Sequence, residues 1–374
     1  MFNKRGNPCG LNFYLGDQKL ENVKEYKYLG LLLTVTGTFA EARENIYKRA
    51  LKGMFKLKAC LGSTNISPKI CLKLFDQLVK PIALYGSEIW GCMKITKKKL
   101  QDHDWMEKMY EMYPAEKLNT SFGKYVLGVN RKTTNAAVLG ELGRYPLGIN
   151  IIISMLKYKK HLEETNNKLL HGARRESTFL HNDGNSSYMT FIDKCCEKLK
   201  INSQDLITSH EISNIRNTLK ENFINFWEKQ IGRNLHSEGK MCTYRKVKFN
   251  FIYENYLDIV YRKDHRVALT KFRVSAHKLE IEKGRYERPY VRREDRKCRH
   301  CKSLNKEVVG NEMHFLLECP LVEDMRTKLW KEVYKKCKYF NSMSQEERFI
   351  YLLTSEGETI RGVAQFCAEG FKRL

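Results

Sequence analysis

The chain has 374 residues, enough for two or three domains, and a hydrophobic share of 42%, which excludes a disordered tail. Lys and Arg total 67 against 43 Asp and Glu, a formal net charge of +24. A surplus of this size opposes compaction unless a polyanion relieves it. Nucleic acid is therefore the expected partner, with an anionic membrane surface second and a solvated basic surface without a binding role as the alternative.

Hydropathy and cysteine usage exclude further classes. No stretch reaches the roughly 18 apolar residues of a membrane span, and no apolar run follows the basic N-terminal residues as in a secretory signal. The 12 cysteines are therefore expected to be reduced thiols in an intracellular protein, nuclear or cytoplasmic. Cys60, Cys71 and Cys92 lie in apolar patterns and are expected to fill the core.

The first part of the chain changes from strand to helix. Leu11–Leu15 and Tyr26–Leu33 are β-prone runs, and Gly16-Asp17 predicts a tight turn after the first. Helical periodicity begins at Thr38, with Phe39, Ile46, Leu51, Met54 and Phe55 expected on the inner face of the first helix. Helices are predicted over 38–62, 68–81, 97–127 and 146–164.

The second half is predicted to be helical after a polar segment. Residues 171–187 indicate a linker or an exposed loop. Two apolar stripes then predict helices: Ile212, Ile215, Leu219, Phe223 and Phe226, closed by Gly232, and Phe249, Ile252, Tyr256 and Ile259. The fold class is therefore mainly α, with a short N-terminal β-hairpin.

A set of metal-ligating residues follows: Cys298, Cys301, His314 and Cys319, spaced C-x2-C-x12-H-x4-C. Two thiolates three residues apart form a knuckle around one Zn²⁺, and a later His and Cys complete a tetrahedron. Four protein ligands without an open position predict a structural zinc knuckle and not a catalytic metal. The alternative is four unrelated reduced side chains. His300 is expected to point away from the metal, and Cys195-Cys196 to pack in the core.

The basic residues cluster along the sequence. Arg292, Arg293, Arg296, Lys297 and Arg299 lead into the knuckle and are a candidate phosphate clamp, with Tyr286 or Tyr290 available to stack on a base. A second cluster, Lys97, Lys98 and Lys99 with Lys94, begins one predicted helix, and a third surrounds another: Arg262, Lys263, Arg266, Lys271 and Arg273. Each cluster taken alone also fits a solvated helix face.

Catalytic motifs are missing from the sequence. No pair of Asp residues in a turn between strands offers the converging carboxylates of two-metal chemistry. No phosphate-binding P-loop and no nucleophile elbow occur, and Gly140 and Gly143 are interpreted as helix-end residues. Catalysis by this chain alone is not expected, nor is a small-molecule substrate.

The order of segments resembles the C-terminal part of reverse transcriptases of LINE-type (non-long-terminal-repeat) retrotransposons. The matching segments, in chain order, are Phe2–Arg5, Tyr26–Gly30, Ala83–Gly91, Phe122–Val129, Gly140–Leu147, Phe272–Ile281 and the knuckle Cys298–Cys319. The family's catalytic aspartates and endonuclease would lie upstream of Met1, so the expectation is a fragment of an RNA-directed DNA polymerase that needs Mg²⁺ only in its missing catalytic part.

The resemblance implies a division of labour along the chain. It assigns residues 1–35 to the end of a palm, 36–165 to a helical thumb, 166–285 to a helical connection and 286–374 to a zinc-knuckle tail. Tyr28 and Gly30 would belong to a hairpin that grips the primer, and the tail would engage template RNA or target DNA. The alternative function is a helical scaffold or protein-interaction module with a structural zinc knuckle.

Overall fold

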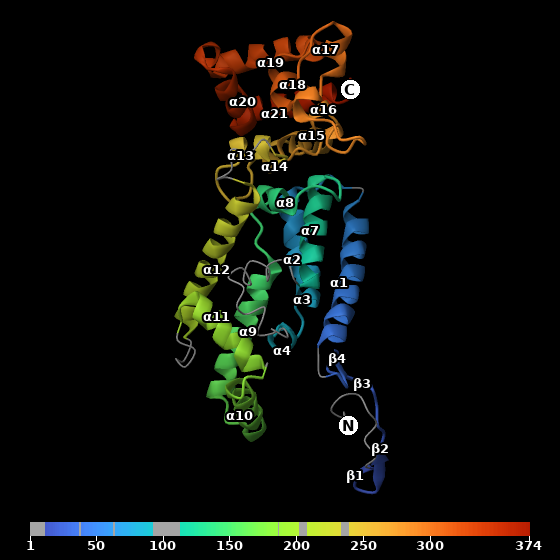
Figure 1. Cartoon of the computed structure of the whole chain (residues 1–374), viewed down its shortest axis with the longest axis vertical. Helices are drawn as coiled ribbons and strands as arrows, with labels where there is room; N and C mark the ends of the chain where they lie inside the picture. Colours follow the sequence, from blue (N-terminus) through green and yellow to red (C-terminus); the bar gives the residue numbers. More distant parts are fainter. Residues whose placement is uncertain are drawn as a thin grey trace. The chain divides into compact units, whose positions relative to one another are not determined.

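A computed structural model describes residues 12–36, 39–62, 64–92, 113–185, 187–201, 208–232 and 239–374. These residues are mainly helical, with short antiparallel hairpins near the N-terminus, as predicted (Figure 1). The chain forms two compact units: unit 1 contains Met1–Lys58, Leu74–Asn119 and Tyr145–Phe223, and unit 2 contains Ala59–Lys73, Thr120–Arg144 and Ile224–Leu374. The four-segment division of the chain stays a prediction.

The N-terminal strands form two hairpins. β1 (Phe13–Leu15) pairs with β2 (Gln18–Leu20) across the predicted turn, where Gly16 has a φ of +61°. The run 26–33, predicted as one β segment, is divided into β3 (Glu25–Tyr28) and β4 (Leu31–Thr34). Leu29 and Gly30 make the turn with φ of 45° and 84°, and two left-handed residues match the twist of paired strands.

The helices of unit 1 are α3 (Lys80–Ala83), α4 (Ser87–Trp90), α9 (Leu147–Glu164), α10 (Lys168–Asn182) and α11 (Tyr188–Leu199). Residues of both units occur in α1 (Ala40–Leu61), α2 (Pro68–Leu78), α7 (Pro114–Leu127) and α12 (Ser209–Gln230). In unit 1, α4 packs on α9. Gly91 permits this approach, since a Cβ there would lie 2.7 Å from Ile151 Cγ2. The N-cap residue of α9, Pro146, has no side-chain acceptor for the first N–H groups of the helix. The buried Glu116 carboxylate accepts the Leu147 N–H at 2.7 Å instead.

The spacing of apolar residues predicted where several helices lie, but it predicted less well which face of each helix is buried. In α1 the expected inward residue Phe55 is exposed, because the buried row runs through Ile46, Ala50, Met54 and Leu57. In α2 Ile70 and Leu78 are exposed, and the buried row runs through Cys71, Leu72, Phe75 and Val79. Many apolar residues on these helices left two neighbouring faces to choose from. In α12 the predicted stripe is buried from Ile212 to Phe223, but Trp227 takes the place expected for Phe226.

Two predictions about the elements were wrong, and one about the core was confirmed in part. Most of the polar segment 171–187 is helix α10, whose N-terminus is capped by Asn167 accepting from the N–H groups of Leu169 and Leu170. The stripe from Phe249 to Ile259 contains only the short α14 (Tyr256–Ile259), because Tyr253 forms an antiparallel bridge with Leu142. Of the cysteines expected in the core, Cys71 is buried, Cys60 is exposed and Cys92 is half-buried.

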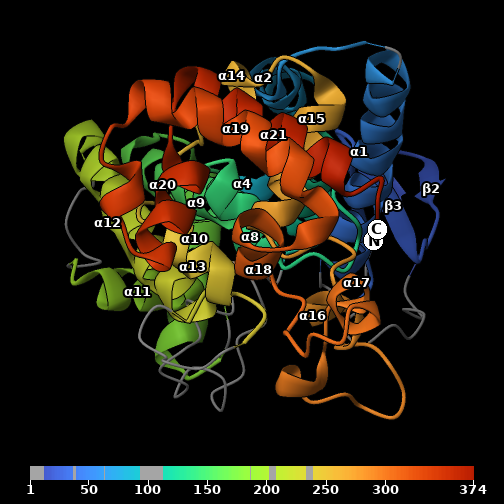
Figure 2. The same cartoon turned by 90° about the horizontal axis from the view of Figure 1, so that it is seen from above.

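Unit 2 is built around α15 (Lys263–Arg273) and α21 (Gly357–Gly370), which pack together, with α19 (Glu323–Lys336) on α21 (Figure 2). Phe272 and Phe315 lie near Phe371 in its aromatic core, with ring centroids about 6 Å apart. The other described α-helices of unit 2 are α8 (Asn135–Glu141), α13 (Cys242–Val247), α14, α16 (Glu280–Lys283), α17 (Arg299–Ser303), α18 (Glu312–Leu317) and α20 (Gln345–Thr354). Unit 2 also contains the 3-10 turns η2 (Arg293–Asp295), η3 (Pro320–Val322) and η4 (Phe340–Ser342).

A buried ionic network holds unit 2 together. The Arg273 guanidinium is fully buried and donates to both carboxylate oxygens of Glu141 at 3.2 Å and to Glu254 at 2.8 Å. Tyr256 donates to Glu141 at 2.6 Å, and the buried Lys248 pairs with Glu254. Burial by itself would lower the pKa of Arg273, but the charges of Glu141 and Glu254 outweigh it and raise the pKa.

The glycines beside Glu141 explain how this carboxylate reaches the network. Gly140 lies inside α8, where a Cβ would be 2.4 Å from Tyr244 Oη and 2.8 Å from Trp227 Nε1. Its position in the last turn of α8, which ends at Glu141, agrees with its interpretation as a helix-end residue, and the close approach of the neighbouring rings requires the glycine. Gly143 does end the helix, with a φ of +55°, and a Cβ there would lie 2.4 Å from the backbone nitrogen of Tyr253.

Replacing Arg273 with Met should destabilise the protein strongly, by about 3–5 kcal/mol, because the fully buried Glu141 carboxylate would remain without its cationic partner. Chemical denaturation would measure the free energy of unfolding. Arg262→Met is the matched control, since Arg262 on the same segment is exposed and pairs with Asp264 at the surface. Equal effects of the two substitutions would contradict this role of the network.

Candidate metal centre

The Cys298–Cys301 knuckle is shaped by a short antiparallel pairing. Lys297 bridges Val309, the Cys298 N–H donates to Val308 O at 2.8 Å, and the Gly310 N–H donates to Arg296 O at 2.9 Å. Cys298 then begins helix α17, which contains Cys301. Gly310 allows the two backbones to meet, because a Cβ there would lie 3.1 Å from Cys298 Cα. Both thiols therefore leave the knuckle on the same side.

The second pair of candidate ligands is positioned by α18 and the turn after it. Asn311 caps α18 by accepting the His314 N–H at 2.8 Å, and the Cys319 N–H donates to His314 O at 2.8 Å. Pro320 ends the turn and begins η3. From α19, the buried Arg326 donates to Leu316 O at 3.0 Å and to Cys319 O at 2.5 Å. The turn with Cys319 is thus anchored to the larger helix.

The four predicted ligands converge. The potential ligand atoms of Cys298, Cys301, His314 and Cys319 all lie within 4.8 Å of one another, and all four residues are buried. Cys298 Sγ is 3.8 Å from Cys319 Sγ, and Cys301 Sγ is 3.3 Å from His314 Nε2. This buried cluster can hold a metal ion. His300 is not among the converging residues, and Cys195 and Cys196 are buried in unit 1, as expected.

The thiols of the cluster influence one another's pKa. A hydrogen bond from Cys319 lowers the pKa of the Cys298 thiol, and the same bond together with burial raises the pKa of Cys319. Burial also raises the pKa of Cys301. Protein groups alone therefore favour only one thiolate here, whereas a divalent cation stabilises several thiolates at once.

Carboxylates that the sequence analysis did not single out support the ligands. Glu318 Oε2 lies 3.2 Å from His314 Nδ1, which directs Nε2 toward the thiols. The i,i+4 spacing of His314 and Glu318 on one helix turn was a signal that could have identified this pair. The buried Glu312 accepts from His277 at 2.9 Å and from Ser275 at 3.1 Å, so it fastens α18 to the segment after α15.

The predicted nucleic-acid contacts beside the knuckle differ in exposure. Arg292 is exposed, Arg293 is half-buried, and Arg299 is exposed with its Nε 3.0 Å from Glu280. Lys297 is half-buried, 3.6 Å from a Glu307 carboxylate oxygen. These cations lie on the segments that carry the metal ligands.

Arg296 requires a correction. It is buried and donates to Val291 O at 3.0 Å, to Ile281 O at 2.9 Å and to Tyr290 Oη at 3.2 Å. Its guanidinium also lies over the Tyr290 ring, 5.5 Å from the centroid. Its hydrogen bonds tie the segment before Cys298 to Ile281 and Val291, and phosphate contact by Arg296 does not fit the structure.

The remaining predicted contacts lie apart from the knuckle. Tyr28 is exposed in the β3–β4 hairpin of unit 1, and Gly30 lies in its turn, where Tyr85 donates to Leu29 O. A Cβ on Gly30 would be 3.3 Å from the Tyr85 ring. Lys97, Lys98 and Lys99 lie outside the described residues.

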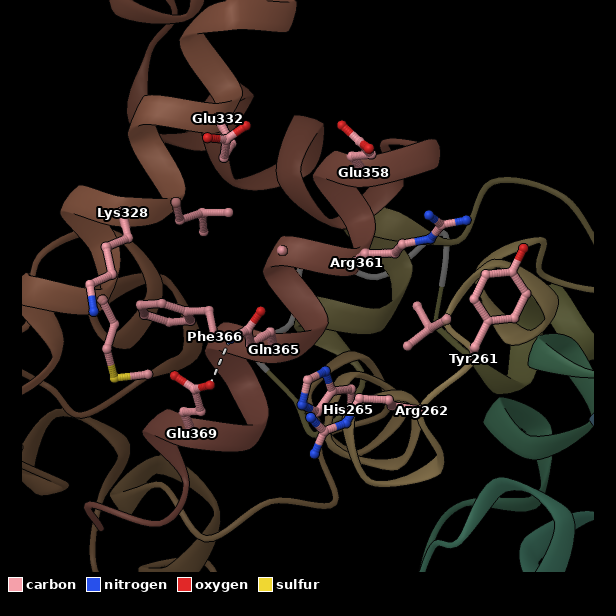
Figure 3. A pocket seen from close by; sticks show the side chains of 14 residues that line it. Tyr261, Arg262, His265, Lys328, Glu332, Glu358, Arg361, Gln365, Phe366 and Glu369 are labelled. Atoms are coloured by element: carbon pink, nitrogen blue, oxygen red, sulfur yellow. Dashed lines mark hydrogen bonds between the residues drawn. The ribbon is translucent and has the colours of Figure 1, made fainter. Parts of the chain in front are cut away.

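Unit 2 also has a pocket of about 590 Å³ between α19, α21 and the start of α15 (Figure 3). Apolar side chains such as Leu329 and Phe366 line it, with Lys328 on α19 and with Arg361 and Glu369 on α21. Its rim carries charges of both signs, and none of its lining residues belongs to the metal cluster.

Comparisons with family models, curated proteins and solved structures found no match to this chain. Among the described residues, no helix has the length and hydropathy required to cross a membrane.

Cys301→Ser should abolish metal binding, because it removes a buried soft ligand from a four-residue set. Elemental analysis should find about one metal ion per wild-type chain and almost none in the variant. The thermal midpoint should fall in the variant, and in the wild type after chelation. Cys337→Ser, a cysteine of unit 2 outside the cluster, is the control that should retain the metal. A wild-type protein that is metal-free when prepared without chelator would rule out the centre.

Glu318→Gln should keep the metal but weaken its binding by about 10- to 100-fold, because the amide orients and polarises the His314 ring less effectively. Competition with a chromophoric chelator would measure the affinity. Glu332→Gln on the exposed face of α19 is the control and should leave the affinity unchanged. An unchanged affinity for Glu318→Gln would show that Glu318 does not orient the ligand.

Proposed function

We propose that this protein binds nucleic acid through a basic surface organised by a structural zinc ion, as the C-terminal part of a LINE-type reverse transcriptase. The observation that carries the proposal is the convergence of Cys298, Cys301, His314 and Cys319 on segments that also carry exposed cations. The proposed role is to hold template RNA, the primer duplex or target DNA while the catalytic part of such an enzyme acts.

Zinc is the metal that the donor set favours. Three thiolates and one imidazole are soft and borderline ligands, which exclude Mg²⁺ and Ca²⁺ as natural occupants. Two sulfurs bound tetrahedrally to zinc at about 2.3 Å lie roughly 3.8 Å apart. The Cys298–Cys319 separation of 3.8 Å equals that edge, and burial of all four residues suits a closed structural site.

Charge and rigidity support nucleic acid as the partner. The knuckle fixes Lys297 and Arg299 beside two ligand cysteines, so a phosphate would meet cations already held in place. Their carboxylate partners Glu307 and Glu280 are on the same local scaffold and would compete only weakly, since surface ion pairs contribute little. The net charge of +24 adds long-range attraction for a polyanion.

The proposal assigns no catalytic residue to this chain. Polymerase and nuclease chemistry requires carboxylates that converge on two divalent ions. In the part of the chain that the structure describes, Cys298, Cys301, His314 and Cys319 are the one group of three or more side chains that could bind a metal together, and this group contains no carboxylate. Mg²⁺ would act in the catalytic part of the parent enzyme.

The second candidate function, a helical protein-interaction module with a structural zinc knuckle, is favoured by the pocket between α19 and α21. Its apolar floor and mixed charged rim are typical of surfaces that bind other proteins. The two functions differ in which surface residues matter, and one set of variants separates them.

Replacing Arg292, Lys297 and Arg299 together with Ala should weaken binding to RNA and DNA and reduce the salt slope of log K by up to about 3, if each contacts one phosphate. Electrophoretic mobility shifts at several salt concentrations would measure both. The matched control replaces the exposed Lys331, Lys335 and Lys338 with Ala, which changes the net charge equally. Equal losses in the two variants would indicate a nonspecific effect of net charge.

Two outcomes would overturn the proposal. Unchanged nucleic-acid binding by the Arg292, Lys297 and Arg299 variant, with loss of a protein partner, would establish the interaction module instead. Primer extension by the purified chain with Mg²⁺ would contradict the absence of a catalytic role.

A further inference from the structure

An exposed tyrosine in unit 2 is surrounded by lysines from distant parts of the sequence. Tyr286 is 57% exposed, although aromatic rings are usually covered. Lys132 Nζ lies 5.6 Å from its ring centroid, and Lys240 Nζ lies 5.7 Å from it. Lys240 also donates to the Tyr286 hydroxyl at 3.0 Å, so this ammonium group lies at the hydroxyl edge of the ring and leaves area over the ring face open.

The ammonium group of Lys124 lies near that of Lys240, because both donate to carbonyls of the same backbone turn. Lys124 Nζ donates to Arg131 O at 2.9 Å, and Lys240 Nζ is 3.5 Å from Lys132 O. Because the two acceptor carbonyls belong to successive residues, the two ammonium groups are near neighbours. Burial and then the charge of Lys240 lower the pKa of Lys124, as expected for cations that repel one another.

The turn that contains Lys132, and whose carbonyls accept from Lys124 and Lys240, is held by internal hydrogen bonds. Thr133 is buried, and its hydroxyl donates to Asn130 Oδ1 at 3.1 Å while its N–H donates to Asn130 O at 3.2 Å. Gly128 begins the turn with a φ of +65°, close against Val267, where a Cβ would be 2.5 Å from Cγ2. The lysines are therefore held together before any ligand arrives, which reduces the entropy cost of binding.

No carboxylate neutralises this cluster within the described residues. Lys124, Lys132 and Lys240 form no ion pair there, whereas Lys246 and Lys248, on the same unit, each pair with a glutamate. Two cations beside an open ring, with a third close to one of them and no counter-charge, form a site suited to an anion that also has a flat face.

We propose that Tyr286, Lys124, Lys132 and Lys240 form a binding site for single-stranded nucleic acid, in which the ring stacks on an unpaired base and the lysines hold the flanking phosphates. This site rests on the proposed nucleic-acid function and assigns it a strand preference. Stacking accepts any base, and the ammonium groups act as point charges on the backbone, so the site reads no sequence. RNA and DNA share this chemistry.

The ring distinguishes this ligand from other polyanions. A base inside a duplex is stacked on its neighbours and cannot cover Tyr286, so a duplex would use only the lysines. An acidic peptide would also use only the lysines. Dependence on the aromatic ring is therefore the property that the test must measure.

The test uses the full chain and four fluorescent probes: an oligouridylate, an oligodeoxythymidylate, a blunt DNA duplex of equal length and a polyglutamate peptide. Tyr286→Leu should weaken binding of both single strands about ten-fold, the loss expected from one stacking contact. Binding of the duplex should not change. Tyr286→Phe keeps the ring and should bind nearly as the wild type does. Tyr339→Leu, at an exposed tyrosine elsewhere in unit 2, is the matched control.

Two further measurements address the lysines and the stacking. Replacing Lys132 and Lys240 with Ala should reduce the salt slope for single strands by about 1.4, from two lost phosphate contacts. A strand that carries a fluorescent base analogue should be quenched by the wild type and by Tyr286→Phe, but less by Tyr286→Leu.

The outcomes separate this site from the proposed function. Salt-dependent binding of nucleic acid that is equal in wild type and Tyr286→Leu overturns the site and leaves the function standing. Polyglutamate that displaces oligouridylate equally well from wild type and Tyr286→Leu overturns it in favour of an acidic protein partner. A wild-type chain that binds none of the nucleic-acid probes at low salt overturns both. A preference for one single strand that is lost in Tyr286→Leu supports the site and identifies which of the two nucleic acids it favours.

Discussion

The Arg273 guanidinium, buried between the Glu141 and Glu254 carboxylates, is the constraint on which the arrangement of unit 2 depends. Removing these charges from water is costly, and their attraction offsets the cost only when every donor has a partner in good geometry. Arg273 meets this condition through two carboxylates and the Leu353 carbonyl, and it lies over the Tyr256 ring. Because Glu141, Arg273 and Leu353 lie at the ends of α8, α15 and α20, these hydrogen bonds restrict how the three helix ends pack together.

The metal cluster is connected to this network by a short path. Ser275 and His277 lie two and four residues after Arg273, and both bond to Glu312 on α18, two residues before His314. Two short helices lie at the candidate metal centre. In α17 Cys301 is the one buried residue, whereas α18 buries Phe315 and Leu316 in the core. A helix as short as α17 is stabilised when a metal or another cross-link holds it. The buried network around Arg273 holds the segment that contacts α18, and a metal ion would hold α17 and α18 together.

Some of the basic residues stabilise the fold and others are available to a ligand, and the composition alone does not distinguish the two groups. Arg266, Arg273, Arg296 and Lys248 are buried and bond to carbonyls or carboxylates, so they stabilise the fold. The lysines around Tyr286 have no carboxylate partner in the described part of the chain and remain available to a ligand. Two of the clusters seen in the sequence thus contain structural arginines, whereas the cluster around Tyr286 combines residues more than a hundred positions apart.

The sequence by itself determined the features that depend on short spacing. The C-x2-C-x12-H-x4-C pattern predicted which four side chains converge, because chelation by a knuckle is local, and periodicity predicted most of the helices. Tertiary structure decided which helix face is buried and which cations are internal. Phe55 is exposed and Arg296 is buried because neighbouring segments cover one side and leave the other open. The pairing of Glu141 with Arg273 links residues 132 positions apart, and only the packed chain brings such groups together.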